Sequence, residues 1–464
     1  GGDRGGRARR VGRRGRRPGK ARPDDGNATS QGQVWDAGAV GAGPAGAAAA
    51  LALAQAGRSV LMVERGPFPG SKNVYGGVVY ARVLDEVLPQ WWLEAPVQRW
   101  VTRRSTMIMT GHQALTIDIR AQKWGEAPYN GMTTYRPDFD AWLAGKAVEA
   151  GAELVTSTVA TGLIRDHHGR VCGVHTDRPG GDLRARVVIA CDGVNSFLAK
   201  EAGLLPAADS VHHTLGVKEV WSLPPDVIEE RYALGPREGL DIEMLGCTRG
   251  IPGGGFLYTG HDTIALGVVV SVEGLAKAKI RPEELIADLR EHPAIAPGLR
   301  GADLKEYAAH LIPEGGYRAM PKLATDGLLV AGDAAGMCLA AGLWLEGVNF
   351  AIGSGLAAGA AVTRAIRSDD VSAKGLASYR SSMEHSFVLA DHKRMQDAPK
   401  FVLSERLHAQ YTGLICDMAE RIFTVTNPVP KPRMTALLRR TVKDHGVRWR
   451  DLAKDAALGG RIFR

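Results

Sequence analysis

A glycine motif near the beginning of the chain restricts its fold more than any other feature. The motif has the spacing G-x-G-x-x-G, and it separates an apolar segment from an alanine-rich one. In this pattern the first glycine permits a tight turn, the second lets the backbone approach a pyrophosphate, and the third allows a helix to pack closely on a strand. The sequence therefore predicts a strand, a turn and a helix that bind a dinucleotide. The motif consists of Gly41, Ala42, Gly43, Pro44, Ala45 and Gly46.

An acidic residue follows the motif at the spacing typical of this fold. We expect the helix to end near Gly57, and a second strand to span Val60 to Val63 and lead into Glu64. Glu64 lies 23 residues after Gly41, where a carboxylate accepts hydrogen bonds from the ribose hydroxyls of adenosine. Because a carboxylate at this place disfavours a 2′-phosphate, we expect FAD or NAD, and not NADP.

Residues far along the chain favour FAD over NAD. FAD is a long dinucleotide whose flavin ring lies far from the adenine, so a flavoprotein holds it with turns that are distant in sequence. Residues 331–355 are rich in small side chains and contain a second glycine turn around a single aspartate, Asp333. The presence of such a turn predicts FAD. The residues with the spacing of additional contacts are Arg136, Val159, Asp192, Gly193, Gly332 and Asp333.

Positive charge is concentrated in the first 22 residues. They hold ten basic residues and one acidic residue, whereas the rest of the chain holds 48 basic and 49 acidic residues. The body of the chain is thus close to neutral, which argues against a nucleic-acid-binding surface. Residues 1–33 contain few apolar side chains, so we expect a disordered basic tail, with contact to RNA or anionic lipid as the alternative.

Metal and nucleophile motifs are missing from the sequence. The five cysteines are scattered and never occur in CxxC spacing, which argues for a reducing compartment and against a zinc site or a four-cysteine iron–sulfur cluster. There is no P-loop, nucleophile elbow or HExxH pattern, so we predict no catalytic acid, base or nucleophile and no metal ligand. Residues 37–56 are uncharged, but they are mostly glycine and alanine and contain the turn, so we predict no membrane-spanning helix.

Several stretches besides the glycine motif form a set found together in one group of flavoproteins. They are VGAGPAG…VERG, PGSKNVYGG, YRPDFDAWL, ACDGVNS, GGGFLYT and AGDAAGM…EGVNFAIGSG. This set resembles the FAD-dependent geranylgeranyl reductase superfamily, and within it the electron transfer flavoprotein–quinone oxidoreductase family. Three C-terminal stretches, PKFVLSERL, RIFTVTNPVPKP and VRWRDLAKDA, resemble the short FixC-type branch of that family. The resemblance covers the chain from about Trp35 to its end.

The resemblance implies an α/β fold. A Rossmann-like FAD-binding domain would be interleaved with a mostly antiparallel β-sheet domain for quinone, and a helical C-terminal segment would follow. We expect the FAD-binding domain in residues 34–210, together with interleaved segments of the second domain, and again in residues 312–370. Residues 211–311, where short strands alternate with loops, would form the quinone or substrate domain. Residues 371–464 would form a helical segment that contacts partners or the membrane.

The same resemblance assigns cofactor contacts along much of the chain. Asp333 would accept a hydrogen bond from the ribityl chain of FAD. The helix that follows, which we predict over Val348 to Ile366, would direct its partly positive N-terminus toward the pyrimidine edge of the flavin and so stabilise the negative charge of reduction. Ser71, Lys72, Asn73, Gly76 and Gly77 would pass near the flavin ring. The other implied contacts are Gly41 to Gly46, Glu64, Arg65, Arg136, Val159, Asp192, Gly193, Gly332, Gly347, Val348 and Asn349.

Several assignments have ordinary structural alternatives. Arg136 could be a surface or capping arginine, Val159 a plain strand residue and Lys72 an exposed lysine. An apolar, ring-shaped substrate such as quinone needs apolar walls and one or two hydrogen-bond donors. An aromatic residue such as Phe256, however, is more often part of a core. The candidates on the quinone side are Gly254, Gly255, Phe256 and Tyr258.

The function that the resemblance implies is an FAD-dependent oxidoreductase that passes electrons from an electron transfer flavoprotein to quinone. Long family members carry a fused iron–sulfur module, and this chain lacks the cysteines for one. A separate ferredoxin-like subunit in a multi-protein complex is therefore implied. Because quinone is a lipid, the expected location is cytoplasmic and peripheral, on the inner face of the cell membrane. The alternative on the same fold is a flavin-dependent prenyl (geranylgeranyl) reductase or aromatic hydroxylase.

Overall fold

The computed structural model describes residues 2, 32–72, 76–205, 213–342, 344–462 and 464. The chain divides into two units, Gly1–Gln33 and Val34–Arg464, and the helices and strands described below belong to the second. The predicted disordered tail falls almost entirely outside the described residues. Asn73 and Val211, the predicted start of the quinone domain, also lie outside them.

A mainly parallel sheet forms the first part of the fold. Its strands follow the order β16-β17-β10-β1-β2-β7, and β1 pairs in parallel with both β2 and β10. Two further strands, β8 and β9, join it by antiparallel pairing. This confirms the predicted Rossmann-like arrangement, including a second strand from Val60 to Val63. The strands are β1 (Val34–Val40), β2 (Val60–Val63), β7 (Glu153–Val155), β8 (Ala160–Arg165), β9 (Val171–Thr176), β10 (Leu183–Ala190), β16 (Ala324–Thr325) and β17 (Leu328–Val330).

Two helices rich in small residues pack against each other in this part of the molecule. They are the alanine-rich α1 (Pro44–Gln55) and the long α8 (Val348–Arg367). A side-chain carbon at Gly355 would lie 2.2 Å from the carbonyl oxygen of Ala45. One at Gly359 would lie 2.8 Å from the carbonyl oxygen of Ala49. Real side-chain carbons do not approach so closely, so the two helices can pack at this distance only with glycine at both places.

A second sheet is mostly antiparallel, with the order β15-β11-β14-β13-β12-β4-β6-β3 and with β5 paired to β4. The exception is β4, which pairs in parallel with β12. Strands β7 to β10 of the first sheet lie in the sequence between β3 to β6 and β11 to β15 of the second sheet. The two sheets are therefore interleaved along the chain, as predicted. The strands are β3 (Gly76–Val79), β4 (Arg99–Met109), β5 (Ala114–Arg120), β6 (Met132–Tyr135), β11 (His213–Ser222), β12 (Glu238–Leu245), β13 (Gly253–Thr259), β14 (Thr263–Ser271) and β15 (Asp303–Pro313).

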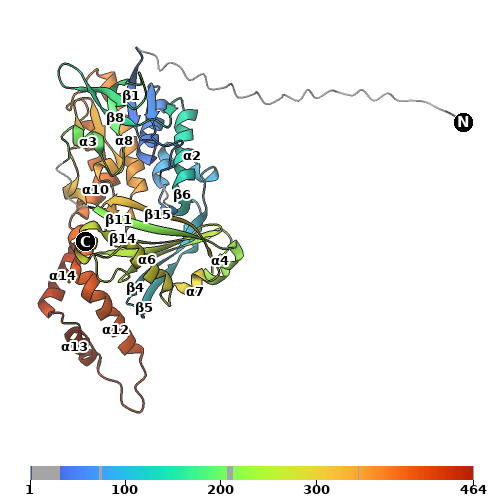
Figure 1. The fold of residues 1–464 in the computed structure, drawn as a ribbon, viewed down its shortest axis with the longest axis vertical. Helices are drawn as coiled ribbons and strands as arrows, with labels where there is room; N and C mark the ends of the chain where they lie inside the picture. Colours follow the sequence, from blue (N-terminus) through green and yellow to red (C-terminus); the bar gives the residue numbers. More distant parts are fainter. Residues whose placement is uncertain (1, 3–31, 73–75, 206–212, 343, 463) are drawn as a thin grey trace. The chain divides into compact units, whose positions relative to one another are not determined.

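The two faces of the second sheet differ in character. One face is apolar and forms a core with short helices, among them α6 and α7, which lie below β11 and β14 in Figure 1. Because side chains alternate along a strand, the neighbouring residues of β12 and β13 belong to the opposite face. That face carries acidic and aromatic side chains. The helices beside the apolar face are α4 (Pro225–Tyr232), α5 (Val272–Ala278), α6 (Pro282–Glu291) and α7 (Ala296–Leu299).

The C-terminal part of the chain is helical, as predicted. No helix in the described part of the chain is both long and apolar enough to cross a membrane. The C-terminal helices are α9 (Ser378–Glu384), α10 (Phe387–Arg394), α11 (Ala398–Val402), α12 (Thr412–Phe423), α13 (Met434–Asp444) and α14 (Trp449–Ile462), with a π-helical turn at Leu407–Tyr411. The remaining elements are α2 (Arg136–Glu149), α3 (Phe197–Glu201), the short hairpin β18 (Leu339–Ala340) and β19 (Leu345–Glu346), and 3-10 turns at Arg82–Glu86, Trp91–Leu93, Gln122–Gly125, Tyr317–Ala319 and Gly332–Ala335.

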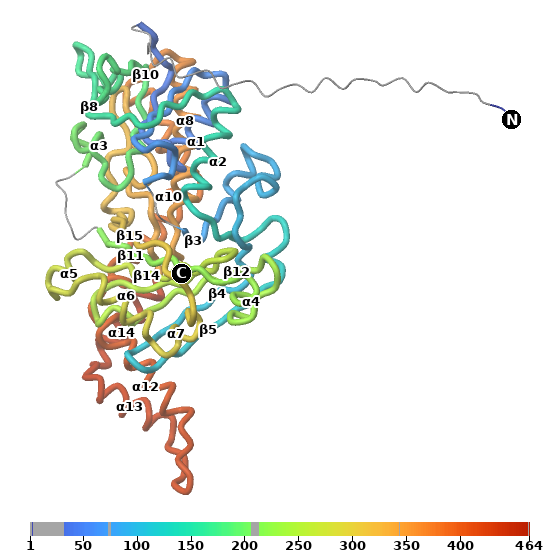
Figure 2. Tube along the Cα trace, turned by 45° about the vertical axis from the view of Figure 1, so that its right-hand side comes forward, coloured from blue at the N-terminus to red at the C-terminus, as the bar shows by residue number. Residues whose placement is uncertain are grey.

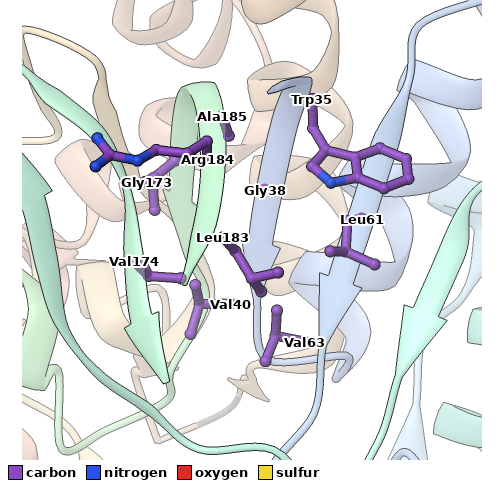
Figure 3. Close-up of a pocket in the computed structure, with 11 residues that line it drawn as sticks. Trp35, Gly38, Val40, Leu61, Val63, Gly173, Val174, Leu183, Arg184 and Ala185 are labelled. Carbon is purple, nitrogen blue, oxygen red and sulfur yellow. The ribbon is translucent and has the colours of Figure 1, made fainter. Parts of the chain in front are cut away.

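A small void lies in the first sheet beside Gly38. Figure 3 shows Gly38 in the middle of β1, with Leu61, Val63 and Leu183 around it. The volume of the void is about 10 Å³. A side-chain carbon at Gly38 would meet only the Cβ of Ala185, at an ordinary contact distance of 3.5 Å. The glycine therefore leaves space that a methyl group could fill.

We expect Gly38→Ala to raise the free energy of unfolding by about 0.5–1 kcal/mol. The added methyl fills the void, and the substitution restricts the unfolded chain. Gly46→Ala serves as the contrasting variant, because its added carbon would lie 1.9 Å from the carbonyl oxygen of Gly41, and it should destabilise the fold. Urea denaturation followed by circular dichroism measures both effects. A less stable Gly38→Ala protein would show that this explanation of the void is wrong.

Candidate active site

The first glycine turn has the close contacts that its motif predicts. Gly41 adopts a positive φ of 98°, and a side-chain carbon there would lie 2.3 Å from the carbonyl oxygen of Cys191. Gly46 packs directly on this turn, since its added carbon would lie 1.9 Å from the carbonyl oxygen of Gly41. Both residues must therefore be glycine for the strand, turn and helix to fit together.

Gly43 differs, because no protein atom requires it to be glycine. It is the N-cap of α1, and no side chain caps this helix. The nearest atoms to an added carbon at Gly43 are the side chains of Arg136 and Asp140, both at 3.9 Å. The space beside Gly43 and the uncapped N-terminus of α1 together form a place for an anionic group.

The carboxylate of Glu64 lies beside this turn. It accepts hydrogen bonds from the backbone N–H of Ala42, at 3.1 Å, and of Gly66, at 2.7 Å. Its backbone N–H donates to Val155, and its carbonyl oxygen accepts from Thr158. Glu64 is thus held firmly at the end of β2, next to the glycine turn, at the position predicted for contact with a ribose.

Arg136 is fixed by an acidic residue one helical turn further along α2. Its Nε lies 2.6 Å from Oδ1 of Asp140, and its Nη2 lies 2.8 Å from Oδ2. Both side chains are largely buried. Burial raises the pKa of Asp140, and the Arg136 guanidinium opposes this effect, whereas the carboxylates of Glu64 and Asp333 add to it. Residues from three distant segments therefore share one electrostatic neighbourhood.

The second glycine turn meets the first. Gly332 has a positive φ of 64°, and an added carbon there would lie 2.8 Å from the Cβ of Ala45 in the first turn of α1. The backbone N–H of Gly332 donates to the Ser354 hydroxyl of α8 at 3.0 Å. A third turn joins them, since the Ser196 hydroxyl donates to the Ala334 carbonyl oxygen at 3.2 Å. Three turns from distant parts of the sequence thus converge at the N-terminal end of α1.

The helix predicted over Val348 to Ile366 is present as α8, which spans Val348–Arg367. Asp333 lies in the 3-10 turn Gly332–Ala335, and the hairpin of β18 and β19 follows before α8 begins at Val348 with Gly347 as its N-cap. The hairpin of β18 and β19 between the turn and this helix was not predicted. The helix N-terminus that lies near the site is that of α8, and it is provided by Gly347, Val348 and Asn349.

The Asp333 carboxylate has no hydrogen-bond partner within the described part of the chain. Burial raises its pKa, and the charges of Arg136 and His310 oppose this effect. The pKa of His310 is lowered by burial, raised by Asp333 and lowered by Arg136 and Arg65. Arg136 and His310 thus act on Asp333 electrostatically, and Arg65 acts on His310. His310, on β15, was not predicted from the sequence, and a lone histidine on an edge strand gives no signal of this role.

The other predicted residues take varied positions. Gly77 is buried in β3, where it pairs with Thr134 of β6, and Lys72 is exposed. Val159 lies beside Thr158 and donates its N–H to the Asp177 carboxylate at 2.9 Å. Of the Asp192 carboxylate, Oδ2 accepts from the Leu198 N–H at 3.1 Å. Oδ1 is buried and has no partner among the described residues.

The predicted quinone residues lie in β13, on two faces of the second sheet. Phe256 and Tyr258 are buried and stacked, with their ring centres 4.8 Å apart. They lie on the face that carries acidic side chains. An added carbon at Gly255 would instead lie 3.1 Å from a side-chain carbon of Leu289 in α6, which places Gly255 on the apolar face. An added carbon at Gly254 would lie 2.6 Å from the Met244 carbonyl oxygen.

A buried ionic cluster on the same face as Phe256 and Tyr258 was not predicted. Arg104 of β4 binds Asp241 at 3.0 Å and Glu243 at 2.8 Å, both in β12. Its guanidinium also lies 5.8 Å from the centre of the Tyr80 ring. The Oδ1 atom of Asp241 has no hydrogen-bond partner in the described structure. The sequence pattern that could have indicated this cluster is the stretch DIEM, in which acidic and apolar residues alternate. In a strand, such alternation places the acidic side chains on one face and the apolar side chains on the other.

The cluster holds more carboxylates than its one guanidinium can neutralise. Burial raises the pKa of Glu243, and Asp241 adds to this effect, while Arg104 opposes it. Glu346 also raises the pKa of Glu243, and it accepts a hydrogen bond from Asn349 at 2.6 Å. Glu346 therefore links this cluster to the N-terminus of α8. At neutral pH the arrangement favours a protonated carboxyl at Glu243.

Comparison with known proteins now adds to this geometry. The sequence pattern described as FAD binding domain matches residues 35–239. The chain is 39% identical to protein FixC of Salmonella typhi, over 93% of this chain and 99% of that protein. It is 38% identical to the probable electron transfer flavoprotein-quinone oxidoreductase YdiS of Escherichia coli K12, over 86% of this chain and 92% of that protein.

The chain belongs to the electron transfer flavoprotein–quinone oxidoreductase family, in its FixC-type branch. Its cofactor is FAD, and it is an FAD-dependent oxidoreductase. Solved structures share the fold. A geranylgeranyl bacteriochlorophyll reductase-like protein of Thermoplasma acidophilum has a TM-score of 0.69 at 22% identity, and covers 89% of this chain and 98% of its own. The flavin-dependent brominase Bmp2 has a TM-score of 0.59 at 17% identity, and covers 93% of this chain and 95% of its own.

The residues of this family member fit FAD on independent grounds. Gly43 borders open space at an uncapped helix N-terminus, which suits a pyrophosphate. The buried Oδ1 of Asp192 and the buried hydroxyl of Ser71 have no partner among the described residues. Such groups are costly unless a ligand satisfies them. The carboxylate of Asp333 is likewise available to a hydroxyl donor.

We expect Asp333→Ala to weaken FAD binding by about tenfold or more while leaving the fold intact. A hydrogen bond to a charged group contributes about 1.5–3 kcal/mol, whereas removal of a half-buried carboxylate without a hydrogen-bond partner costs the apoprotein little. Flavin content after gel filtration and thermal unfolding of the apoprotein measure the two effects. Asp226→Ala, at an exposed position in α4, is the control. Full flavin content in an unstable Asp333→Ala protein would instead indicate a purely structural aspartate.

The free energy of unfolding should fall as the pH rises, and we expect Glu243→Gln to make this fall smaller. The pKa of Glu243 is raised in the folded state, so unfolding releases a proton once the pH exceeds the ordinary glutamate value of about 4.3. Rising pH therefore favours unfolding, by at most about 1.4 kcal/mol per pH unit. Urea denaturation between about pH 5.5 and pH 8 measures the slope. Glu291→Gln, at an exposed position, should leave the slope unchanged.

Proposed function

We propose that the chain passes electrons from an electron transfer flavoprotein to a quinone through its bound FAD, within a multi-protein complex. The observation that carries this proposal is the link through Glu346. On one side Glu346 accepts a hydrogen bond from Asn349 at the N-terminus of α8. On the other side it influences Tyr80 and Glu243, on the face that carries Phe256 and Tyr258. A cofactor site and an aromatic-lined face therefore adjoin.

We assign the cofactor roles as follows. Gly43 and the N-terminus of α1 would hold the pyrophosphate, and Glu64 would hold the adenosine ribose. Asp333 would accept a hydrogen bond from the ribityl chain. The N–H groups of Gly347 and its neighbours would bind the pyrimidine edge, where the dipole of α8 would stabilise negative charge. When bound, FAD supplies the redox chemistry by taking up and releasing electrons.

We assign the substrate to the face of Phe256 and Tyr258. Stacked aromatic side chains suit the flat ring of a quinone. Reduction of a quinone to a hydroquinone consumes two electrons and two protons. Burial and the nearby Asp241 raise the pKa of Glu243, so its carboxyl is suited to hold a proton and donate it on that face. Arg104 holds that carboxyl in place through its 2.8 Å contact.

The name of the YdiS relative supports the electron donor and acceptor classes. We further propose a separate ferredoxin-like subunit, because the five cysteines of this chain are scattered without CxxC spacing. We place the protein in the cytoplasm, peripherally on the inner face of the cell membrane, since its substrate is a lipid.

The purified FAD-loaded protein should reduce a short-chain quinone when a reduced electron transfer flavoprotein supplies the electrons. Phe256→Ala should raise the KM for quinone about two- to tenfold, because stacking between two aromatic rings contributes about 0.5–1.5 kcal/mol beyond their burial. Stopped-flow reduction of the flavin by the partner should remain unchanged. Phe197→Ala is the control, since Phe197 is exposed in α3.

Two outcomes would contradict the proposal. One is rapid reduction of a prenyl double bond by the isolated chain, with no reduction of quinone, which would favour the alternative reductase on the same fold. The other is an unchanged KM for quinone in Phe256→Ala together with intact flavin reduction. That result would indicate that Phe256 is only a core residue and that the quinone binds at another place.

A further inference from the structure

A cavity of about 270 Å³ lies between α10, the hairpin of β18 and β19, and the end of α14. Figures 1 and 2 both show the C-terminal end of the chain between α10 and the body of α14. The cavity has room for several water molecules, since one water occupies about 30 Å³ in the liquid. We call it the hairpin cavity. Its lining residues, half of them charged, are Leu339, Trp344, Glu346, Asp391, Arg394, Met395, Ile462 and Arg464.

Glu346 connects this cavity with the buried ionic cluster of the second sheet. In the hairpin it pairs with Leu339, which also lines the cavity. Its carboxylate accepts a hydrogen bond from Asn349 at 2.6 Å. The charges of Asp391, at the cavity, and of Arg104, in the ionic cluster, both act on this carboxylate. One side chain therefore borders a space for water on one side and the ionic cluster on the other.

The face proposed for quinone is buried, although its reaction consumes protons. The exposed fractions are 7% for Phe256 and 8% for both Tyr258 and Glu243. A proton that Glu243 donates there must be replaced from solvent. Besides burial and Asp241, the charge of Glu346 contributes to the raised pKa of Glu243, so the two carboxyls lie close enough to influence each other. Glu346 is thus placed to pass protons from the hairpin cavity to Glu243.

The surroundings of Glu346 allow its carboxyl to bind and release a proton. Burial raises its pKa, the hydrogen bond from Asn349 lowers it, Asp391 raises it and Arg104 lowers it. Because these influences oppose one another, neither the protonated nor the ionised form is strongly excluded. The titratable and charged groups that act on Glu346 or line the cavity with it are Tyr80, Arg104, Glu243, Asp391, Arg394 and Arg464.

We propose that Glu346 relays protons from the hairpin cavity to Glu243, which donates them to a quinone bound at Phe256 and Tyr258. This inference rests on the proposed function, because the reduction of quinone is the reaction that consumes protons on that face. Each proton forms one O–H bond on the quinone, and Glu243 then regains a proton through Glu346 from water in the cavity. Two such transfers accompany the two electrons that the partner flavoprotein supplies through FAD. The quinone is reduced to hydroquinone and the partner flavoprotein is oxidised.

The alternative is a purely structural Glu346 that only holds the start of α8 through Asn349. Glutamine preserves this contact, because its side-chain oxygen also accepts a hydrogen bond. Glutamine has no proton to release, however. Glu346→Gln therefore removes the relay and keeps the structural contact, so it separates the two roles.

Steady-state kinetics of the FAD-loaded full chain, with reduced electron transfer flavoprotein as electron donor, test the relay. Glu346→Gln should lower kcat for a short-chain quinone by about tenfold or more and leave KM unchanged, since it removes a proton-transfer group and no quinone contact. Reduction of ferricyanide, which accepts electrons without protons, should keep its unmodified rate. Glu346→Asp should retain most of the quinone activity, and formate, a small acid that the cavity can admit, should raise the rate of Glu346→Ala several-fold.

Glu384→Gln is the matched control, because Glu384 is exposed in α9, and it should reduce both acceptors at the unmodified rate. Flavin content is measured for every variant. Two outcomes would overturn the relay. One is an unmodified kcat for quinone in Glu346→Gln. The other is an equal loss of quinone and ferricyanide reduction at full flavin content, which would indicate a structural Glu346.

Infrared spectroscopy provides a readout that needs no turnover. The carbonyl band of a protonated carboxyl should be present in the unmodified protein and weaker in Glu243→Gln. Glu346→Gln removes a negative charge that raises the pKa of Glu243, so this band should titrate at lower pH in that variant. An unchanged titration would show that the two carboxyls do not interact, and it would overturn the relay even if the variant lost activity.

Failure of the relay and failure of the proposed function are distinguishable. An unmodified protein that reduces ferricyanide but no quinone would contradict the proposed function, and the relay with it. An unmodified protein that reduces quinone, together with a Glu346→Gln variant that reduces it equally fast, would overturn the relay alone.

Discussion

The contact between Gly332 and the first turn of α1 is the constraint on which the arrangement of the site depends. Any side chain at Gly332 would collide with Ala45, and any side chain at Gly355 would collide with the backbone of the same turn. Small residues therefore bring the second glycine turn and α8 against the N-terminus of α1. These contacts bring the N-terminus of α1, which favours anions, and the second glycine turn together at one place.

The second sheet contributes a different kind of constraint. Its polar face is buried, so its charged groups must satisfy one another. Arg104 forms ion pairs with both Asp241 and Glu243. Its single positive charge does not neutralise both carboxylates together with the nearby Glu346, which also raises the pKa of Glu243. The remaining imbalance is relieved by proton binding. The cluster is thus suited to proton transfer in a way that a neutral apolar wall would not be.

Much of the first sheet and its glycine contacts could be predicted from the sequence, because the signals are local. The spacing of Gly41 to Gly46 and the position of Glu64 follow directly from the covalent chain. The start of α8 at Val348 was also predicted, but the two-stranded hairpin that separates it from Asp333 was not. The ionic cluster was missed because it depends on the parallel pairing of β4 with β12, and strand register over such a distance has no local signal. The same limit applies to His310, which reaches Asp333 only through the path of β15.

The interleaving of the two sheets also affects how the chain can fold. Strand β1 pairs with β10, and β10 pairs with β17, which is synthesised only at residues 328–330. Strand β4 likewise pairs with β12, which is synthesised at residues 238–245. Neither sheet is complete when the ribosome has made the first half of the chain. Such distant pairings close large loops and slow folding, so the nascent chain passes through states with open strand edges. The candidate cofactor site combines a turn that is synthesised early, at residues 41–46, with one that is synthesised late, at residues 332–335. It is therefore among the last parts of the molecule to form.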